Sequence, residues 1–506
     1  MDHIHLIFFS LLSFIPLLLL IKLSIPKKGK NLPPSPPSLP IIGHLHLIKG
    51  PVHRVLQHLS FKYGPIMALR FGSRRVLVIT SPSAVEECFT KNDIVLANRP
   101  LLLSGKYFDY DHMGISSVPY GRLWRDVRRV MTLELFSTTR LKTYTSVRQD
   151  EVRSLIKELF QDSFQGFKRV ELKSRFQGLP FNIILKIVAG KRFDGTNMND
   201  LKEVSEFKDV ISDVFEASGA SNPSDFIPFL KWDDFQGLEK RFSKLQNKSD
   251  NFLQNLIDEC RSKRFDSCKE KGKAKTFIDT ILSLQELEPE YYTDNVIKGN
   301  ILALLLAGTD TSSVTIEWAM SLLLNHPNVL EKAKAEVDES TGQERLVQET
   351  DLPNLPYIQC IVNETLRLFP AAPLLVPHES SEDCTIGGFD VARGTIVLVN
   401  ALAIHRDPTV WDDPLSFKPE RFEKMGKEGY RFIPFGVGRR QCPGYGLANR
   451  VVGLALASLI QCFEWERVGE ELVELSEGKG LTMPKDEPLV AMCKARQQVS
   501  HLLKEL

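Results

Sequence analysis

The sequence feature that most constrains the fold is a loop of glycines and prolines around one cysteine, Phe432–Gly446 (FIPFGVGRRQCPGYG). An apolar helical pattern follows the loop directly. The free N–H groups and dipole at the start of a helix lower the pKa of a nearby thiol and favour the thiolate that metals bind. The loop therefore predicts a metal-ligating Cys442, with close approach of the backbone to a flat ligand at Gly436, Gly438 and Gly444.

Other kinds of cysteine site fit this loop less well. A dinucleotide-binding G-x-G-x-x-G would need glycine where Gln441 stands. A thiol hydrolase built on Cys442 would need a histidine partner, for which the chain has no recognisable motif. Eight cysteines without a C-x-x-C pair argue against a zinc site and a disulfide scaffold, and favour a reduced, cytosolic catalytic part.

The segment from Phe435 to Gly444 resembles the haem-binding signature of cytochromes P450, F-x-x-G-x-R-x-C-x-G, at every fixed position. The resemblance implies a mainly α (α+β) fold, with a helix-rich body around a buried haem b and small β-sheets. It also implies that Cys442 is the axial ligand of the haem iron. Phe435, Gly436 and Gly444 are then expected to lie against the cofactor, and Arg440 to pair with one of its carboxylates.

A charged motif supports this resemblance. Glu364 and Arg367 stand one helical turn apart, which by itself indicates an ordinary surface pair. In the family the matching E-x-x-R pairs with an arginine of a later loop, and Arg421 in Pro-Glu-Arg-Phe occupies that place. We expect the three residues to form a buried network that the fold requires and the chemistry does not use.

The long helical pattern from Asn295 carries Ala-Gly-Thr-Asp-Thr at 307–311. Ala303, Ala307 and Thr311 share one face, and close packing on another helix is an alternative explanation for such small residues. With the resemblance, Gly308 and the threonine hydroxyl are expected to open the helix and make room for dioxygen. Asp310 and Thr311 then become the candidates for proton delivery.

A second helix is expected at the edge of the haem. Trp124 and Arg128 match the family's W-x-x-x-R, share a face and both donate hydrogen bonds, which suits a haem carboxylate. Arg125 and Arg129 fit either a basic helix end or a patch for an acidic electron-donating protein. His378 lies in a segment that approaches haem in relatives.

The N-terminal region predicts attachment to a membrane. Residues 4–21 are nearly all apolar and long enough to span a bilayer. A cleaved signal is the alternative, but no basic residue precedes the run and no A-x-A site follows it. Lysines after the run predict a cytosolic body. The expected organisation is a single-pass anchor in the endoplasmic reticulum at 1–25, a basic, proline-rich hinge at 26–40 and a catalytic domain at 41–506.

The remaining pattern is mostly helical. Two β-branched stretches, Ile66–Phe71 and Val76–Thr80, predict a hairpin. The charged segment Arg261–Lys275 predicts a solvated loop. Further helices are expected at Ser83–Lys91, Leu123–Leu135, Val147–Gln161, Phe181–Val188, Asn295–Asn325, Val329–Glu339, Tyr357–Leu368 and Gly446–Phe463.

The resemblance implies a monooxygenase that uses O2. The chain has no flavin or nicotinamide motif, so its electrons would come from an NADPH-cytochrome P450 reductase. A net charge of +1, from 64 basic and 63 acidic residues, excludes a field that would collect nucleic acid. The sequence is most similar to the plant microsomal group that contains isoflavone 2'- and 3'-hydroxylases, which implies a small lipophilic substrate of phenolic, terpenoid or alkaloid type.

Substrate contacts are expected from residues that are apolar or aromatic, although each could instead belong to the core. They are Tyr107, Phe108, Tyr110, Ala303, Leu304, Leu374, Leu375, Val376 and Met483. Oxidative ring closure or phenol coupling at the same haem, and a haem protein without catalysis, remain alternatives to hydroxylation. Product analysis separates hydroxylation, which adds one oxygen, from ring closure or coupling, which removes two hydrogens. NADPH consumption that requires substrate and reductase excludes the haem protein without catalysis.

Overall fold

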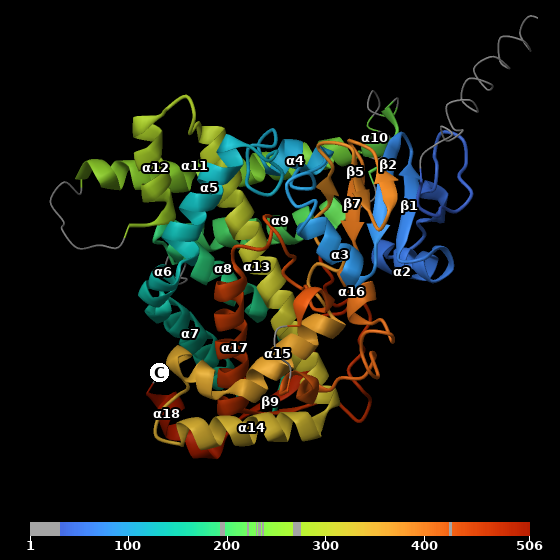
Figure 1. Cartoon of the computed structure of the whole chain (residues 1–506). Coiled ribbons are helices and arrows are strands. Elements are labelled where there is room, and N and C mark those ends of the chain that lie inside the picture. Colours follow the sequence, from blue (N-terminus) through green and yellow to red (C-terminus); the bar gives the residue numbers. More distant parts are fainter. Residues whose placement is uncertain are drawn as a thin grey trace, which may run out of the picture.

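A helical body with small sheets makes up the described part of the molecule, as predicted (Figure 1). The computed structural model describes residues 31–192, 198–219, 222–228, 230, 234, 237–266, 275–424 and 428–505. The predicted membrane anchor lies outside the described residues. The helices are α2 Val52–Tyr63, α3 Pro82–Phe89, α4 Leu103–Phe108, α5 Arg122–Met131, α6 Thr138–Thr143, α7 Thr145–Ser163, α8 Lys173–Ala189, α9 Met198–Gly219, α10 Pro223–Phe226, α11 Leu238–Asp266, α12 Phe277–Leu287, α13 Asp294–Asn325, α14 Pro327–Thr341, α15 Pro356–Leu368, α16 Ala401–His405, α17 Tyr445–Cys462 and α18 Ser500–Lys504.

The predicted hairpin is confirmed as β1 (Ile66–Phe71) and β2 (Arg74–Ile79), which pair antiparallel around Gly72. β2 also pairs parallel with β7 (Ile396–Val399), and β4 (His378–Glu379) completes this sheet in the order β1-β2-β7-β4. Two smaller sheets are formed by β3 (Lys168–Glu171), β9 (Val490–Ala495) and β8 (Phe463–Glu466), and by β5 (Cys384–Ile386) and β6 (Phe389–Val391).

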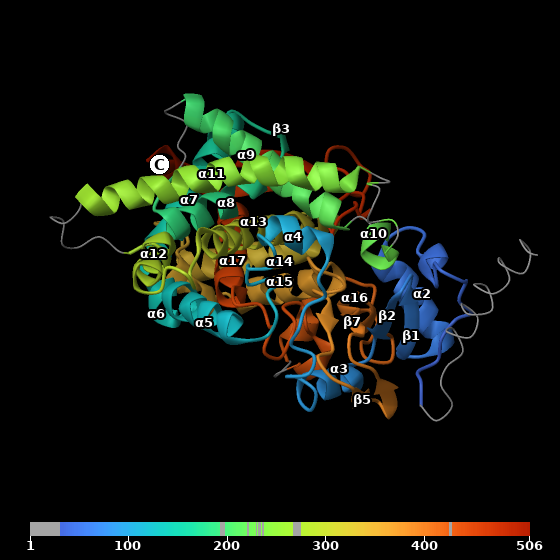
Figure 2. The ribbon, with the colours of Figure 1, turned by 90° about the horizontal axis from the view of Figure 1, so that it is seen from above.

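Helix α13 runs through the middle of the body, with α17 and α15 packed beside it (Figures 1 and 2). It begins where the Thr293 side chain accepts a hydrogen bond from the Val296 N–H, a favourable N-cap. α8 packs closely along it. A Cβ at Gly308 would lie 2.7 Å from Ile184 Cγ1 of α8. Gly308 is therefore a close-packing residue, and its expected role in making room for dioxygen stays a prediction.

Helix α11 corrects another prediction. Residues 261–266, expected in a solvated loop, continue this helix for its last turns. Their charges are paired: Arg261 bonds Asp294 at 2.7 Å, and Arg264 lies 3.3 Å from Glu286 on α12. The charged composition reflects ion pairs between neighbouring helices, which a search for apolar periodicity does not detect.

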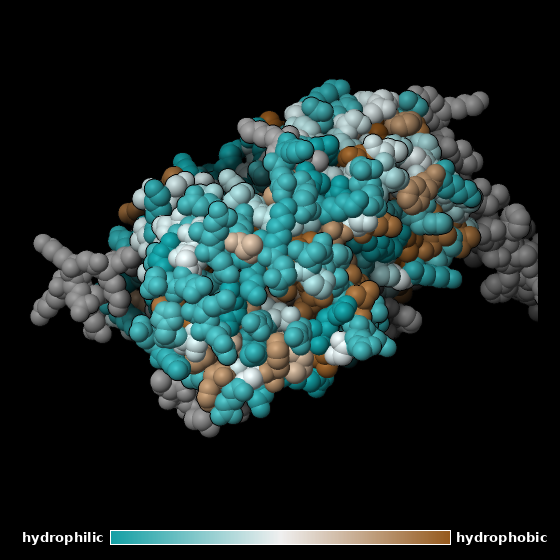
Figure 3. Space-filling model, turned by 90° about the horizontal axis from the view of Figure 1, so that it is seen from below, coloured by the Kyte–Doolittle hydropathy of each residue, from teal (hydrophilic) through white to brown (hydrophobic). Residues whose placement is uncertain are grey.

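In the part of the chain that the structure describes, α17 is the only helix long and apolar enough to cross a membrane, and most of it is buried in the core. Its apolar character therefore reflects packing against α13, α14 and α15. The face in Figure 3 is mostly hydrophilic, and its larger hydrophobic areas lie toward the end of the molecule that carries β1 and β2. Exposed Leu39, Ile41 and Phe61 belong to the chain around this hairpin.

Candidate haem site

The cysteine loop is held by its own backbone. The Cys442 N–H donates to the Phe435 carbonyl at 2.9 Å, and the Gly436 N–H donates to the Ile433 carbonyl at 3.0 Å. Gly436 has φ +66° and Gly438 φ +73°, so both adopt the left-handed conformation that side chains disfavour. The apolar helix predicted after the loop is α17, with Gly444 at its N-cap. Cys442 thus lies just before a helix start, as the sequence predicts.

The pKa of the Cys442 thiol is raised in the protein without a ligand, whereas the sequence predicted that it would be lowered. Desolvation raises the pKa of Cys442 above its ordinary value. The backbone N–H groups of Gly444 and Tyr445 and the charge of Arg128 oppose this increase, because all three favour the thiolate. The expected helix-start effect is present but smaller than the cost of burial. A cation bound to the sulfur would add the attraction that stabilises the thiolate.

The loop glycines have different neighbours. A Cβ at Gly438 would lie 2.5 Å from Asp93 Oδ1 and 3.2 Å from the Phe89 side chain. Gly438 therefore allows the loop to pack on the end of α3, and its expected approach to the ligand stays a prediction. A Cβ at Gly444 would lie 3.9 Å from Cys442 Sγ and 3.7 Å from the Phe136 ring, so Gly444 stays beside the thiol.

The three-residue charged network is confirmed. Arg367 donates to both carboxylate oxygens of Glu364, at 2.7 and 2.8 Å, and Arg421 Nε donates to Glu364 Oε1 at 3.0 Å. Glu364 and Arg367 are fully buried. Arg367 also donates to the carbonyls of His405 and Pro414, both at 2.7 Å. The network thus connects α15 to the chain that leads into the cysteine loop.

Trp124 and Arg128 lie on one face of α5, as predicted. Trp124 is buried, and the Arg128 guanidinium lies 6.0 Å from its ring centre. In the described part of the chain, neither the Trp124 N–H nor the Arg128 guanidinium forms a hydrogen bond to another residue. Both side chains therefore keep hydrogen-bond donors for a ligand. Arg128 lies close enough to Cys442 for its charge to lower the pKa of the thiol.

Arg440 and Arg99 add positive charge to this region. The Arg440 guanidinium donates to the carbonyls of Ala97 at 2.7 Å and Val118 at 2.5 Å, and it lies 4.8 Å from the Trp124 ring centre. Burial and the charge of Arg128 lower the pKa of Arg440 to about 10. Burial and the charge of Arg440 likewise lower the pKa of Arg99, whose Nε is buried without a hydrogen-bond partner among the described residues.

We call Arg99, Arg128 and Arg440 the arginine cluster. One buried carboxylate, Asp109, acts on both Arg99 and Arg440. Buried positive charge in excess of its partners is costly, so the cluster fits a ligand that carries negative charge. His378 lies close enough for both Arg99 and Arg440 to lower its pKa, and its Nδ1 bonds the Leu96 carbonyl at 2.7 Å.

The candidate for a second wall of the site is the face of α13 that carries Ala303, Ala307 and Thr311. Ala307 is exposed and the other two are half-buried, although the helix runs through the centre of the body. Small residues left uncovered in an interior helix fit a flat group placed over them. A thiol before a helix start, cationic donors beside it and this bare face together fit haem b.

Asp310 and Thr311 point in different directions from α13. Thr311 Oγ1 donates to the Ala307 carbonyl at 2.7 Å, the predicted bond back to the helix. Asp310 is buried, and its Oδ2 has no hydrogen-bond partner among the described residues. Burial raises the pKa of Asp310 to about 6, against smaller opposing effects of Thr482 and Lys173. A cavity of about 130 Å³ adjoins Asp310 and is also lined by Lys173, Glu317 and Thr482.

The residues predicted to contact substrate have diverse surroundings. The Tyr107 hydroxyl bonds Glu239 of α11, the Tyr110 hydroxyl bonds Asp250 of the same helix, both at 2.8 Å, and Phe108 packs on Phe242 at 5.0 Å. Met483 is buried beneath Trp318, whose N–H donates to its carbonyl at 2.7 Å. Leu304 and Leu375 are buried, Leu374 is half-buried and Val376 is exposed. Their contact with substrate stays a prediction.

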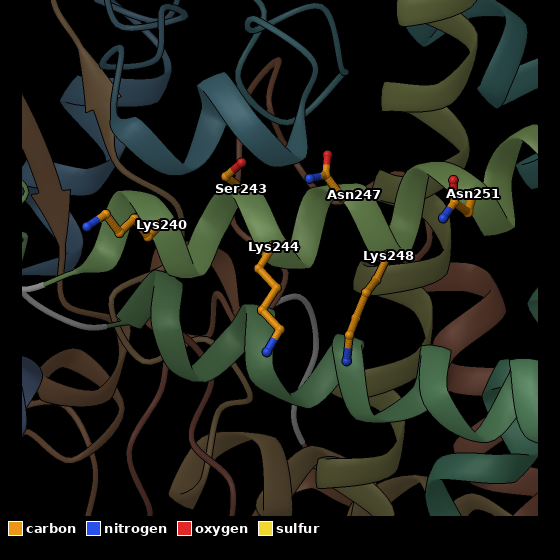
Figure 4. A pocket seen from close by; sticks show the side chains of 6 residues that line it. All are labelled: Lys240, Ser243, Lys244, Asn247, Lys248 and Asn251. Atoms are coloured by element: carbon orange, nitrogen blue, oxygen red, sulfur yellow. The ribbon is translucent and has the colours of Figure 1, made fainter.

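A larger hollow of about 490 Å³ lies on the outer side of α11 (Figure 4). Its lining consists of lysines, asparagines and a serine: Lys240, Ser243, Lys244, Asn247, Lys248 and Asn251. The side chains come from one helix and lack acid–base or metal-ligating partners, so this hollow is a surface groove and not the candidate site.

Two residues of the site were missed by the sequence analysis. Arg99 is a single charge between apolar stretches, and that isolation is the signal that would have identified it. His405 stands in His-Arg-Asp-Pro, where nothing local indicates its contacts. It is fully buried, and its Nε2 accepts the Ile433 N–H at 3.0 Å.

Comparisons with known proteins agree with this site. The family model of cytochrome P450 matches residues 33–492. An isoflavone 2'-hydroxylase of Glycyrrhiza echinata is 50% identical over 95% of this chain and 95% of its own length, which confirms the predicted similarity to that plant group. A (+)-piperitol/(+)-sesamin synthase of Sesamum radiatum is 52% identical over 94% of this chain and 93% of its own.

A solved structure shows the same architecture. A zebrafish cytochrome P450, described with abiraterone, is 26% identical, with a TM-score of 0.75 over 89% of this chain and 100% of that one. The cysteine loop, the charged network and these matches lead to one conclusion: the chain belongs to the cytochrome P450 family.

Proposed function

We propose that this monooxygenase hydroxylates a lipophilic plant specialised metabolite at a carbon held over the Ala303–Ala307 face of α13. Relatives that cover nearly the whole chain carry the names of an isoflavone hydroxylase and a lignan synthase, which places flavonoid-like and lignan-like phenolics first among the candidate substrates. Terpenoids and alkaloids remain further candidates. The observation that carries the proposal is Cys442 in its loop before a helix start, with the charge of Arg128 acting on the thiol.

Each residue has a distinct proposed role. Cys442 holds the iron, and the haem, once bound, supplies the activation of O2, since a thiolate ligand favours O–O cleavage. Arg440, Arg128 and Trp124 hold the haem carboxylates, together with Arg99. Phe435, Gly436, Gly444 and His378 line the cofactor, and Ala307 and Ala303 leave room above it. Glu364, Arg367 and Arg421 maintain the chain around the loop.

Asp310 and Thr311 are the proposed route for protons. The Asp310 carboxyl has a pKa of about 6, so it both accepts and releases a proton near neutral pH. Its cavity, lined by Lys173 and Glu317, provides room for water from the solvent side. The Thr311 hydroxyl is held toward the bare face by the Ala307 carbonyl and passes the proton onward.

Electrons come from NADPH through a flavoprotein reductase. We place its docking surface at the basic outer side of α5, where Arg125 and Arg129 are exposed. The proposed location is the endoplasmic reticulum membrane, with residues 1–25 as a single-pass anchor, 26–40 as a hinge and the catalytic domain, 41–506, facing the cytosol.

The test is a reconstitution of the full chain in microsomes with reductase, NADPH and a panel of isoflavones, lignans, terpenoids and alkaloids. A product heavier by one oxygen atom, formed only with NADPH, supports hydroxylation. The lignan synthase relative favours a second candidate, oxidative ring closure, for which the product is lighter by two hydrogens. NADPH consumption unaffected by every substrate contradicts both and indicates a non-catalytic haem protein.

A further inference from the structure

His405 connects the charged network to the cysteine loop through a single residue. Its backbone carbonyl accepts a hydrogen bond from Arg367 Nη1 at 2.7 Å, and its side-chain Nε2 accepts the Ile433 N–H at 3.0 Å. The side chain is fully buried, and its ring lies 5.5 Å from that of Phe432. One residue therefore contacts both the α15 network and the first residues of the loop.

Ile433 is the fixed point from which the loop is built. Its N–H is held by His405, and its carbonyl accepts the Gly436 N–H at 3.0 Å. Phe435 lies between Ile433 and Gly436 in this turn, and its carbonyl accepts the Cys442 N–H at 2.9 Å. A displacement of Ile433 is therefore transmitted to the cysteine through two backbone hydrogen bonds.

The chemistry of His405 suits a permanent acceptor. Because a backbone N–H can only donate, Nε2 must be unprotonated and Nδ1 must carry the ring proton. Burial and the charges of Arg367 and Arg406 lower the pKa of His405 to about 3, so the ring stays neutral at physiological pH. Nδ1 forms no well-aligned hydrogen bond among the described residues, although the backbone of Arg367 and Leu366 lies close enough to oppose part of the pKa decrease. The bond to Ile433 is therefore the best-aligned polar contact of the ring in the described part of the chain.

We propose that His405 is a positioning residue for the axial ligand: its Nε2 holds Ile433 and thereby sets where the loop presents Cys442 to the haem iron. This inference rests on the proposed haem–thiolate role of Cys442. It assigns His405 no contact with substrate or cofactor. Its function is to transmit the rigidity of the Glu364–Arg367 pair to the loop.

The test compares two substitutions of nearly equal size. His405→Phe keeps a buried ring but removes the acceptor, whereas His405→Gln offers a side-chain oxygen near the same place. Trp465→Phe is the control, because it loses one buried hydrogen bond, from Trp465 Nε1 to the Leu459 carbonyl at 2.9 Å, at β8 and away from the loop.

The first readout is the reduced carbon monoxide difference spectrum of each full-length variant in microsomes. We expect His405→Phe to shift the ratio of thiolate-type to non-thiolate-type band on the order of tenfold, because a buried donor loses its partner. His405→Gln should restore most of the ratio, and Trp465→Phe should keep the parent ratio. A parent-like ratio in His405→Phe would overturn the inference.

The second readout does not need haem. Hydrogen exchange of the solubilised protein should be on the order of tenfold faster over residues 430–441 in His405→Phe than in Trp465→Phe. Equal rates in both variants would overturn the inference even if the spectra changed. If the parent protein lacks the thiolate-type band, the haem–thiolate function itself fails, whereas a normal parent with an unaffected His405→Phe rejects only the role of His405.

Discussion

The two walls of the haem site are built in opposite ways. On the cysteine side, Cys442 is tied to Phe435, Ile433 to His405, and Glu364 to two arginines, nearly all through buried hydrogen bonds. On the α13 side, Ala307 is exposed and Ala303 and Thr311 are half-buried. The difference supports the proposal that the protein holds the iron ligand rigidly and leaves the α13 side open for O2 and a substrate.

The strongest test of the comparison is removal of the sulfur. Cys442→Ser keeps the size of the side chain but loses the soft ligand, so we expect complete loss of the thiolate-type band and of product formation. The measurement is the reduced carbon monoxide difference spectrum. Cys384→Ser, at a half-buried free cysteine of β5, is the control and should keep the band. A thiolate-type band in Cys442→Ser would mean that the ligand has been assigned wrongly.

The next test disturbs the rigid wall from a distance. Glu364→Gln leaves Arg367 buried beside a neutral partner, so it should lower the free energy of unfolding by about 3–5 kcal/mol and reduce haem incorporation. Thermal denaturation checks the first and haem content per protein the second. The exposed pair Lys494–Glu464, 3.8 Å apart, provides the control, since Glu464→Gln should cost under about 1 kcal/mol. An equal loss of unfolding free energy in Glu364→Gln and Glu464→Gln would show that the buried network stabilises the fold no more than an exposed ion pair.

The buried Asp310, on another side of α13 from Thr311, should have its own pH dependence. The pKa of Asp310 is raised by burial from 3.8 to about 6, so between these values the folded protein keeps a proton that the unfolded chain has lost. The contribution of Asp310 to the free energy of unfolding therefore falls, by about 3 kcal/mol, as the pH rises from about 4 to about 6. Asp310→Asn should lack this decrease, as thermal denaturation across pH can show. Parallel pH profiles for both proteins would contradict the raised pKa.

The smallest predicted effect separates two adjacent residues of α13. Ala307→Phe fills the bare face and should reduce product formation by about tenfold, which is roughly 1.4 kcal/mol, while haem binding persists. Gly308→Ala places a Cβ 2.7 Å from Ile184, so it should lower stability by about 1–3 kcal/mol with little change in substrate preference. Turnover and melting temperature distinguish the two variants. Lower turnover in Gly308→Ala and lower stability alone in Ala307→Phe would contradict the assignment of the two faces of α13.

The sequence predicted the rigid wall far better than the open one. Cys442, Glu364, Arg367 and Arg421 lie in short motifs whose geometry is local, and each was found where expected. The close packing of Gly308 was missed because its neighbour, Ile184, is more than a hundred positions away in the chain. The aromatic residues around 107–110 were predicted from their character alone, and their contacts with α11 depend on packing that no motif records.

The arginine cluster has a consequence for the life of the chain in the cell. Without a bound anion, the Arg440 guanidinium is repelled by those of Arg99 and Arg128, so the folded protein without haem carries a charge repulsion that a bound anion would relieve. A ligand that binds only the folded form stabilises it in proportion to its free concentration. Haem supply during synthesis should therefore set how much of this enzyme accumulates, because chains that fold without haem open more often and become substrates for proteolysis.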